Sequence, residues 1–189
     1  MMASSPVSKP DRVRATACDY RSDNEAVYQA LKRAVDPLDS AWSTLAKARR
    51  IGVKINQDWP PDRVVMYQGQ RQQLVSDAVA RATLRLLRER TTAEIFVVDV
   101  AADDTPPGKT RLEYTSILPV LREMDVPYVD GSEEPVVWMP VPGGGLIFDR
   151  YPVTRACAEA DAMVSVQKLK NHSFMGITLT TKNLFGLMP

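Results

Sequence analysis

The sequence predicts an α/β protein built in three layers: a mostly parallel sheet, helices on both faces, and a small β-hairpin insertion. The first observation is that helical and extended patterns alternate along the chain. The second is that the expected strands are short, nearly continuous apolar runs, which is typical of strands buried on both faces. The third is the composition: 44% hydrophobic and 25% charged residues suit one soluble domain with a real core.

The N-terminal third is expected to begin with a flexible stretch, because residues 1–12 are rich in Ser and Pro. The single domain is therefore placed at 13–189. A weak alternation predicts a strand at 13–18. Ser22 and Glu25 have the spacing of a capping box for a helix that Pro37 ends. A second, shorter helix is expected at 40–47.

The middle of the chain continues the alternation. A strand at 51–55 precedes a Pro-containing loop at 58–61. The clearest helix spans 72–90, with an apolar face and arginines opposite. The remaining expectations are a strand at 94–100, a loop at 101–109, a helix at 110–124, a strand at 126–130, a hairpin from 136–139 and 146–148, a helix at 154–159 and a strand at 162–166.

Composition also excludes several classes of protein. A formal net charge of +1 gives no reason to expect nucleic acid or an anionic membrane as partner. No apolar run reaches about 18 residues and the N-terminus lacks a secretory pattern, so a cytoplasmic protein is expected. The two cysteines form no CxxC pair, so this chain alone is expected to ligate no iron–sulfur cluster.

Basic residues follow two of the expected strands. Lys54 lies within the strand at 51–55, and Asn56 follows it; Lys168, Lys170 and His172 follow the strand at 162–166. Parallel strands bring their carboxyl ends to one crevice, and residues two apart share a face, so these side chains are expected to converge on a small anion. The alternatives are an edge strand with Lys54 in solvent, and a solvated basic loop.

A helix starting near Gly176 would add three further groups to this site. Thr178 and Lys182 are four residues apart, and Asn183 follows. The free N–H groups at such a helix start would favour an anion. For Lys182 alone, an exposed position near a helix C-terminus explains the residue equally well. Lys170 and His172 are the candidate catalytic residues, since His titrates near neutral pH.

Acidic residues offer a competing site. Asp99 lies near the end of the strand at 94–100, Asp103 and Asp104 follow it, and Asp149 follows the expected strand at 146–148. Paired carboxylates can hold a metal ion, but a solvated acidic loop is the favoured interpretation. Cys157 lies on an apolar helical face and is interpreted as a core residue.

The C-terminal stretch VSVQKLKNHSFMGITLTTKNLFGLMP resembles the signature of the family called domain of unknown function 362. The matching positions are Lys168, Lys170, His172, Gly176, Thr178, Lys182, Asn183 and Gly186. Val53-Lys54-Ile55-Asn56 is similar to the family's strand ending in Lys-Pro-Asn, with Ile55 in place of proline. The resemblance spans roughly 13–189.

The resemblance implies an α/β fold but no single activity. Many members are described as iron–sulfur proteins because Cys clusters are fused to them, and this chain has no such cluster. Members also continue past the Lys-Asn-x-x-Gly segment, so the chain resembles the N-terminal part of a larger unit. The apolar residues around Leu184 and Phe185 are then expected to need cover from another subunit or a separate C-terminal or ferredoxin-like chain.

Besides a structural module, in which the lysines and asparagines only tie loops together through hydrogen bonds, two functions remain open from the sequence. One is an enzyme, or half of one, that binds a small carboxylate or phosphate in a cleft of Lys, His and Asn side chains. The other is a non-catalytic module that binds a ligand or cofactor and partners an iron–sulfur redox protein. The cofactor itself is unknown from the sequence.

Overall fold

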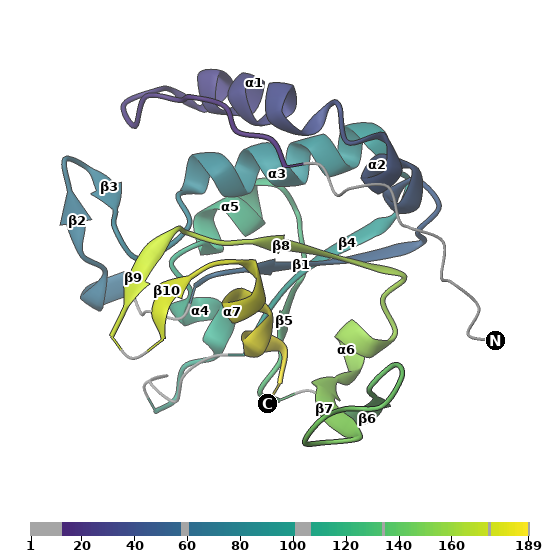
Figure 1. Cartoon of the computed structure of the whole chain (residues 1–189). Coiled ribbons are helices and arrows are strands. Elements are labelled where there is room, and N and C mark those ends of the chain that lie inside the picture. Colours follow the sequence, from purple (N-terminus) through teal and green to yellow (C-terminus); the bar gives the residue numbers. More distant parts are fainter. Residues whose placement is uncertain (1–12, 58–60, 101–106, 134, 174, 189) are drawn as a thin grey trace.

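The computed structural model describes residues 13–57, 61–100, 107–133, 135–173 and 175–188, with a parallel four-stranded sheet at the centre (Figure 1). The sheet order is β5-β4-β1-β8. Its strands are β1 (Arg50–Ile55), β4 (Glu94–Asp99), β5 (Tyr128–Asp130) and β8 (Ala162–Val166). The predicted α/β class and the predominantly parallel sheet are confirmed.

Helices cover both faces of this sheet, as Figure 1 shows. Ile51, Val53 and Ile55 point to one face and pack with apolar residues of α3 and α5. Phe96 and Val98 point to the other face and pack with α6 and η2. The first face carries α2 (Asp39–Leu45), α3 (Asp77–Arg90) and α5 (Leu118–Glu123), and α1 (Asn24–Val35) packs on the outer side of α3. The second face carries α6 (Arg155–Ala158), α7 (Thr180–Leu184) and the 3-10 helix η2 (Phe185–Leu187).

The strand order creates a topological switch point between β1 and β8. From β1 the chain moves to β4 and then β5 on one side, and it later returns to add β8 on the other side of β1. The carboxyl ends of β1 and β8 lie side by side at this point, and the chain after β8 passes back over them through α7. This is where open α/β sheets bind ligands.

The N-terminal region differs from the prediction in two places. Residues 13–18 form no strand and are exposed. The cap of α1 is Asp23, whose Oδ1 accepts a hydrogen bond from Ala26 N at 2.8 Å, in place of the predicted capping box of Ser22. The predicted flexible residues 1–12 lie outside the described part of the chain.

The helix predicted at 72–90 starts later, at Asp77, with Ser76 as its cap. The residues before it form an unpredicted hairpin of β2 (Met66–Tyr67) and β3 (Gln70–Arg71). Its turn residues Gln68 and Gly69 both have positive φ, as a two-residue hairpin turn requires. Strands of two residues are too short to show an alternation of apolar and polar residues, so the sequence pattern did not predict this hairpin. The loop predicted from residue 58 lies partly outside the described residues, and 61–63 form the 3-10 helix η1 (Pro61–Arg63).

The helix predicted at 110–124 is two helices, α4 (Arg111–Tyr114) and α5. Pro119 occupies the first turn of α5, where its missing N–H costs nothing. In one continuous helix its ring would clash with the carbonyl of Thr115, four residues back. Thr115 instead adopts an extended conformation, which separates the two helices.

The predicted hairpin insertion exists, but its second strand is displaced. β6 (Val136–Pro140) pairs with β7 (Arg150–Thr154), whereas 146–148 lie in the connecting loop. The side chains of Leu146, Ile147 and Phe148 are exposed there. Gly143 and Gly144 take positive φ within this loop, which moves the turn away from the position that the apolar run had indicated.

The stretch after β8 differs most from the prediction. A second hairpin, β9 (Lys170–His172) and β10 (Gly176–Thr178), replaces the expected start of a helix. Gly176 has a φ of 75°, which a helix start does not use. α7 begins only at Thr180, so the predicted helix start near Gly176 is wrong, and Gly176 offers no helix N-terminus for an anion. Within the part of the chain that the structure describes, none of the helices has the length and hydropathy needed to cross a bilayer.

Candidate functional site

A cavity of about 280 Å³ lies at the switch point between β1 and β8. It brings together six of the eight predicted site residues from β1, the β9–β10 hairpin and α7. These are Lys54, Asn56, Lys170, Thr178, Lys182 and Asn183. Asp99, Val100, Phe185, Gly186 and Met188 complete the lining.

Lys54 forms the buried base of this cavity. β1 lies between β4 and β8, so the edge-strand alternative for Lys54 is wrong. Its side chain is 3% exposed, and its Nζ lies 2.7 Å from Asp99 Oδ1. The other carboxylate oxygen, Asp99 Oδ2, accepts a hydrogen bond from Gln57 N at 3.1 Å. An ammonium buried in an apolar strand is tolerable because this carboxylate offsets its charge.

Asn183 fastens α7 over the same strands. Its Oδ1 accepts a hydrogen bond from Lys54 Nζ at 3.3 Å, and its Nδ2 donates to Ser165 Oγ at 2.9 Å. Nδ2 also lies 3.3 Å from Lys54 O and 3.4 Å from Val166 O. The carboxamide thus spans the carboxyl ends of β1 and β8, and these hydrogen bonds hold α7 against the two strands.

Gly186 lets the chain pass directly over the ion pair. A Cβ at this position would lie 2.8 Å from Lys54 Cε and 3.3 Å from Asp99 Oδ1. Its carbonyl oxygen accepts a hydrogen bond from Val100 N at 3.0 Å. A side chain here would press against the Lys54 side chain while the ion pair holds it in place, so this close approach favours glycine.

The polar wall of the cavity comes from the β9–β10 hairpin and α7. Lys170 and Thr178 are partners across that hairpin. Thr178 is 3% exposed, and its hydroxyl has no hydrogen-bond partner among the described residues. Lys182 on α7 places its Nζ 6.0 Å from the centre of the Phe185 ring. Among the described residues that line this small space, three lysines and one aspartate give an excess of positive charge.

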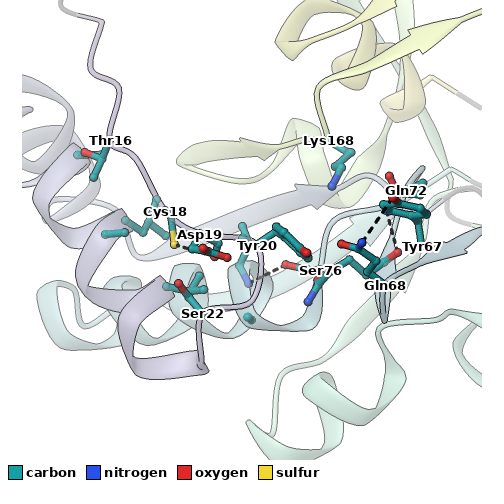
Figure 2. A pocket seen from close by; sticks show the side chains of 17 residues that line it. Thr16, Cys18, Asp19, Tyr20, Ser22, Tyr67, Gln68, Gln72, Ser76 and Lys168 are labelled. Atoms are coloured by element: carbon teal, nitrogen blue, oxygen red, sulfur yellow. Dashed lines mark hydrogen bonds between the residues drawn. The ribbon is translucent and has the colours of Figure 1, made fainter.

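Two predicted site residues lie elsewhere. Lys168 lines a separate cavity beside α1 and the β2–β3 hairpin (Figure 2). β8 ends at Val166, so the alternation from Lys168 to His172 does not run along one continuous strand. His172 does not line the switch-point cavity; its Nδ1 accepts a hydrogen bond from Met175 N at 3.3 Å within the hairpin loop.

The acidic residues that the structure describes are not gathered into a metal site. Asp99 is buried against Lys54, Asp149 has a side chain that is 84% exposed, and Asp103 and Asp104 lie outside the described residues. The described residues include no cluster of three or more His, Cys, Asp or Glu side chains arranged to hold a metal ion. Cys157 is in the core, as predicted. Asp99 lines the switch-point cavity but was not among the predicted site residues; the signal in the sequence that could have identified it is its position at the end of a buried strand.

The comparisons with known proteins identify a family but no activity. The family model described as domain of unknown function (DUF362) matches residues 51–189. Neither a curated protein nor a solved structure matches the chain significantly. The match starts at β1, so the resemblance predicted from residue 13 is too long: α1 and α2 lie outside it. Because the match covers most of the chain and includes every residue of the switch-point cavity, the protein belongs to the DUF362 family.

Proposed function

We propose that the protein binds a small oxyanion, a carboxylate or a phosphate, in the switch-point cavity, as an enzyme or as half of one. The observation that carries this proposal is the combination of excess positive charge with the buried hydroxyl of Thr178, which has no described partner. Lysine ammonium groups and a hydroxyl are suitable donors for an oxyanion. A volume of about 280 Å³ suits a small ligand rather than a nucleotide.

The geometry divides the work among these residues. Lys54 is held by Asp99 and Asn183 and sets the positive base of the cavity. Lys170 and Lys182 reach the space from two different elements and supply the direct charge. Lys170 is the candidate acid or base in the enzyme version, because His172 does not line the cavity.

The position of His172 favours a second candidate: a non-catalytic module that holds an anionic ligand or cofactor for a separate redox partner. Side chains whose pKa lies near neutral pH are the usual general acids and bases in catalysis. None of the residues that line the cavity is a histidine. In this version the same lysines bind the anion, and the reaction takes place on the partner.

Thermal unfolding in phosphate, sulfate and citrate, at one ionic strength set with chloride, tests the binding site. We expect a higher midpoint with at least one oxyanion, and loss of most of that gain in Lys170→Ala and Lys182→Ala. Lys109→Ala is the matched control, since Lys109 is exposed and lies beside the Tyr114 ring. Equal gains in all variants would indicate a non-specific salt effect and contradict the site.

Native mass spectrometry of protein purified without added ligand distinguishes the two versions. A retained metabolite that is converted on incubation supports the enzyme. A retained molecule that stays unchanged, and is altered only when a redox protein is added, supports the binding module.

A further inference from the structure

Lys168 belongs to a different hollow, of about 490 Å³, between the segment before α1, the start of α3 and the β2–β3 hairpin (Figure 2). Its floor consists of small and branched apolar side chains of α1 and α3, namely Val27, Ala30, Leu31, Ala34, Ala78 and Val79. Its rim is polar: Tyr20, Tyr67, Gln68 and Gln72 surround the opening, and Lys168 extends toward it from beyond β8.

A second, apolar groove, of about 730 Å³, lies between α1, α2, α3 and the edge strand β8. Leu31 and Val79 line both spaces, so the two are neighbours across these side chains. The groove is walled by Val35, Leu38, Trp42, Leu45, Leu86 and Leu87. Because the two spaces share these lining side chains, we treat them as one candidate site with a polar mouth and an apolar interior, and call it the α1–β8 channel.

Charge is concentrated at the mouth of the channel. Lys168 is the single cation among the described residues that line either space. The two lining carboxylates are already engaged: Asp19 binds Arg21 at 2.9 Å, and Asp161 Oδ2 accepts hydrogen bonds from Arg49 N and Arg50 N at 2.8 and 2.9 Å. No ion pair links Lys168 to a carboxylate in the described ranges. A ligand that complements this arrangement has one negative charge at one end.

We propose that the α1–β8 channel binds a long-chain monocarboxylate, with its carboxylate at Lys168 and its hydrocarbon chain along Leu31 and Val79 toward Trp42. The apolar walls match the chain, and the single lysine matches one charged head group. A second copy that paired with the edge of β8 would fill the groove without using the polar mouth. Residues 16–35 form much of the channel and lie outside the family match, so the site is a feature of this chain.

Calorimetric titration with octanoate and dodecanoate, both kept below the concentration at which they form micelles, tests the channel. Each buried methylene contributes about 0.8 kcal/mol, roughly fourfold in affinity. We therefore expect dodecanoate to bind at least tenfold more tightly than octanoate. Lys168→Gln should weaken dodecanoate binding by roughly tenfold, as expected for loss of a charge-assisted contact.

Lys182→Gln is the matched control, because it alters the switch-point cavity and leaves the channel intact. Its dodecanoate affinity should equal that of the wild type, which keeps this test separate from the proposed oxyanion site. Equal affinities for the two chain lengths, or an unchanged affinity in Lys168→Gln, would overturn the proposal. A dimer in sedimentation velocity that takes up no dodecanoate would assign the groove to a second copy instead.

Discussion

Lys54 Nζ and Asp99 Oδ1 lie 2.7 Å apart beneath Gly186, at the carboxyl ends of two adjacent parallel strands. The side chains of both residues are only 3% exposed. The pair joins the sheet to the C-terminal segment, because Asn183 contacts Lys54 and the carbonyl of Gly186 binds Val100. Stability and the proposed binding site therefore depend on the same few atoms.

The first prediction concerns Gly186→Ala. The backbone φ of −75° suits alanine, so the effect comes from the new methyl group, 2.8 Å from Lys54 Cε. Because the ion pair prevents Lys54 from moving aside, we expect a loss of about 1–3 kcal/mol in the free energy of unfolding, measured by urea denaturation. Phe185→Ala, at a neighbouring residue that is 65% exposed, should change it by less than about 0.5 kcal/mol. Equal values for both variants would mean that Gly186 is not sterically required.

The second prediction concerns the ion pair itself. Lys54→Met removes the ammonium and leaves the Asp99 carboxylate buried without it, which should destabilise the protein by about 3–5 kcal/mol. The double variant Lys54→Met/Asp99→Asn should recover much of this loss, since neither charge is then buried. A double-mutant cycle from urea denaturation gives the coupling energy. Strictly additive losses would show that the two residues do not act as a pair.

The third prediction separates binding from stability at Thr178. Its buried hydroxyl has no described partner, so Thr178→Val should leave the free energy of unfolding unchanged within about 0.5 kcal/mol or raise it. The same substitution should reduce the rise in the unfolding midpoint that oxyanions produce in the wild type.

Thr154→Val is the matched control for Thr178→Val. The Thr154 hydroxyl is also buried but lies 3.2 Å from Leu187 O, to which it donates a hydrogen bond. Its removal should cost about 1 kcal/mol. If Thr178→Val is destabilised as much as Thr154→Val, the Thr178 hydroxyl has a structural role.

The fourth prediction is a dependence on pH that arises at Asp161. A hydrogen bond from Arg49 N and a second one from Arg50 N lower the pKa of the Asp161 carboxyl below its ordinary value of 3.8, and the first has the larger effect. A group with a lowered pKa in the folded state stabilises the protein above the unfolded-state pKa, and the stabilisation disappears as pH falls through the folded-state pKa. The stability difference between wild type and Asp161→Ala should therefore be full at pH 6 and shrink below about pH 4.

Thermal unfolding between pH 6 and pH 3 measures this difference. Asp149→Ala is the control for loss of an aspartate as such, since the Asp149 side chain is 84% exposed. A difference between wild type and Asp161→Ala that grows as the pH falls would contradict the assignment.

Local patterns in the sequence determined much of the fold. The apolar runs of β1, β4 and β8 and the alternating helices predicted a parallel α/β sheet. They also placed Lys54 and Asn56 at one strand end and Lys170 after another, and parallel strands bring such ends together for a general geometric reason. Six of the eight predicted site residues consequently line one cavity.

Only the tertiary structure decided which charges meet. Asp99 contacts Lys54 because β1 and β4 pair in the register Lys54↔Val98. Lys54 and Asp99 are 45 positions apart in the sequence, so no local pattern encodes their contact. β8 ends at Val166 and the chain then turns into the β9–β10 hairpin, so Lys168 and Lys170 enter different cavities. Side-chain periodicity specifies a face only while a strand continues; where it ends, the pairing of distant segments determines where each side chain lies.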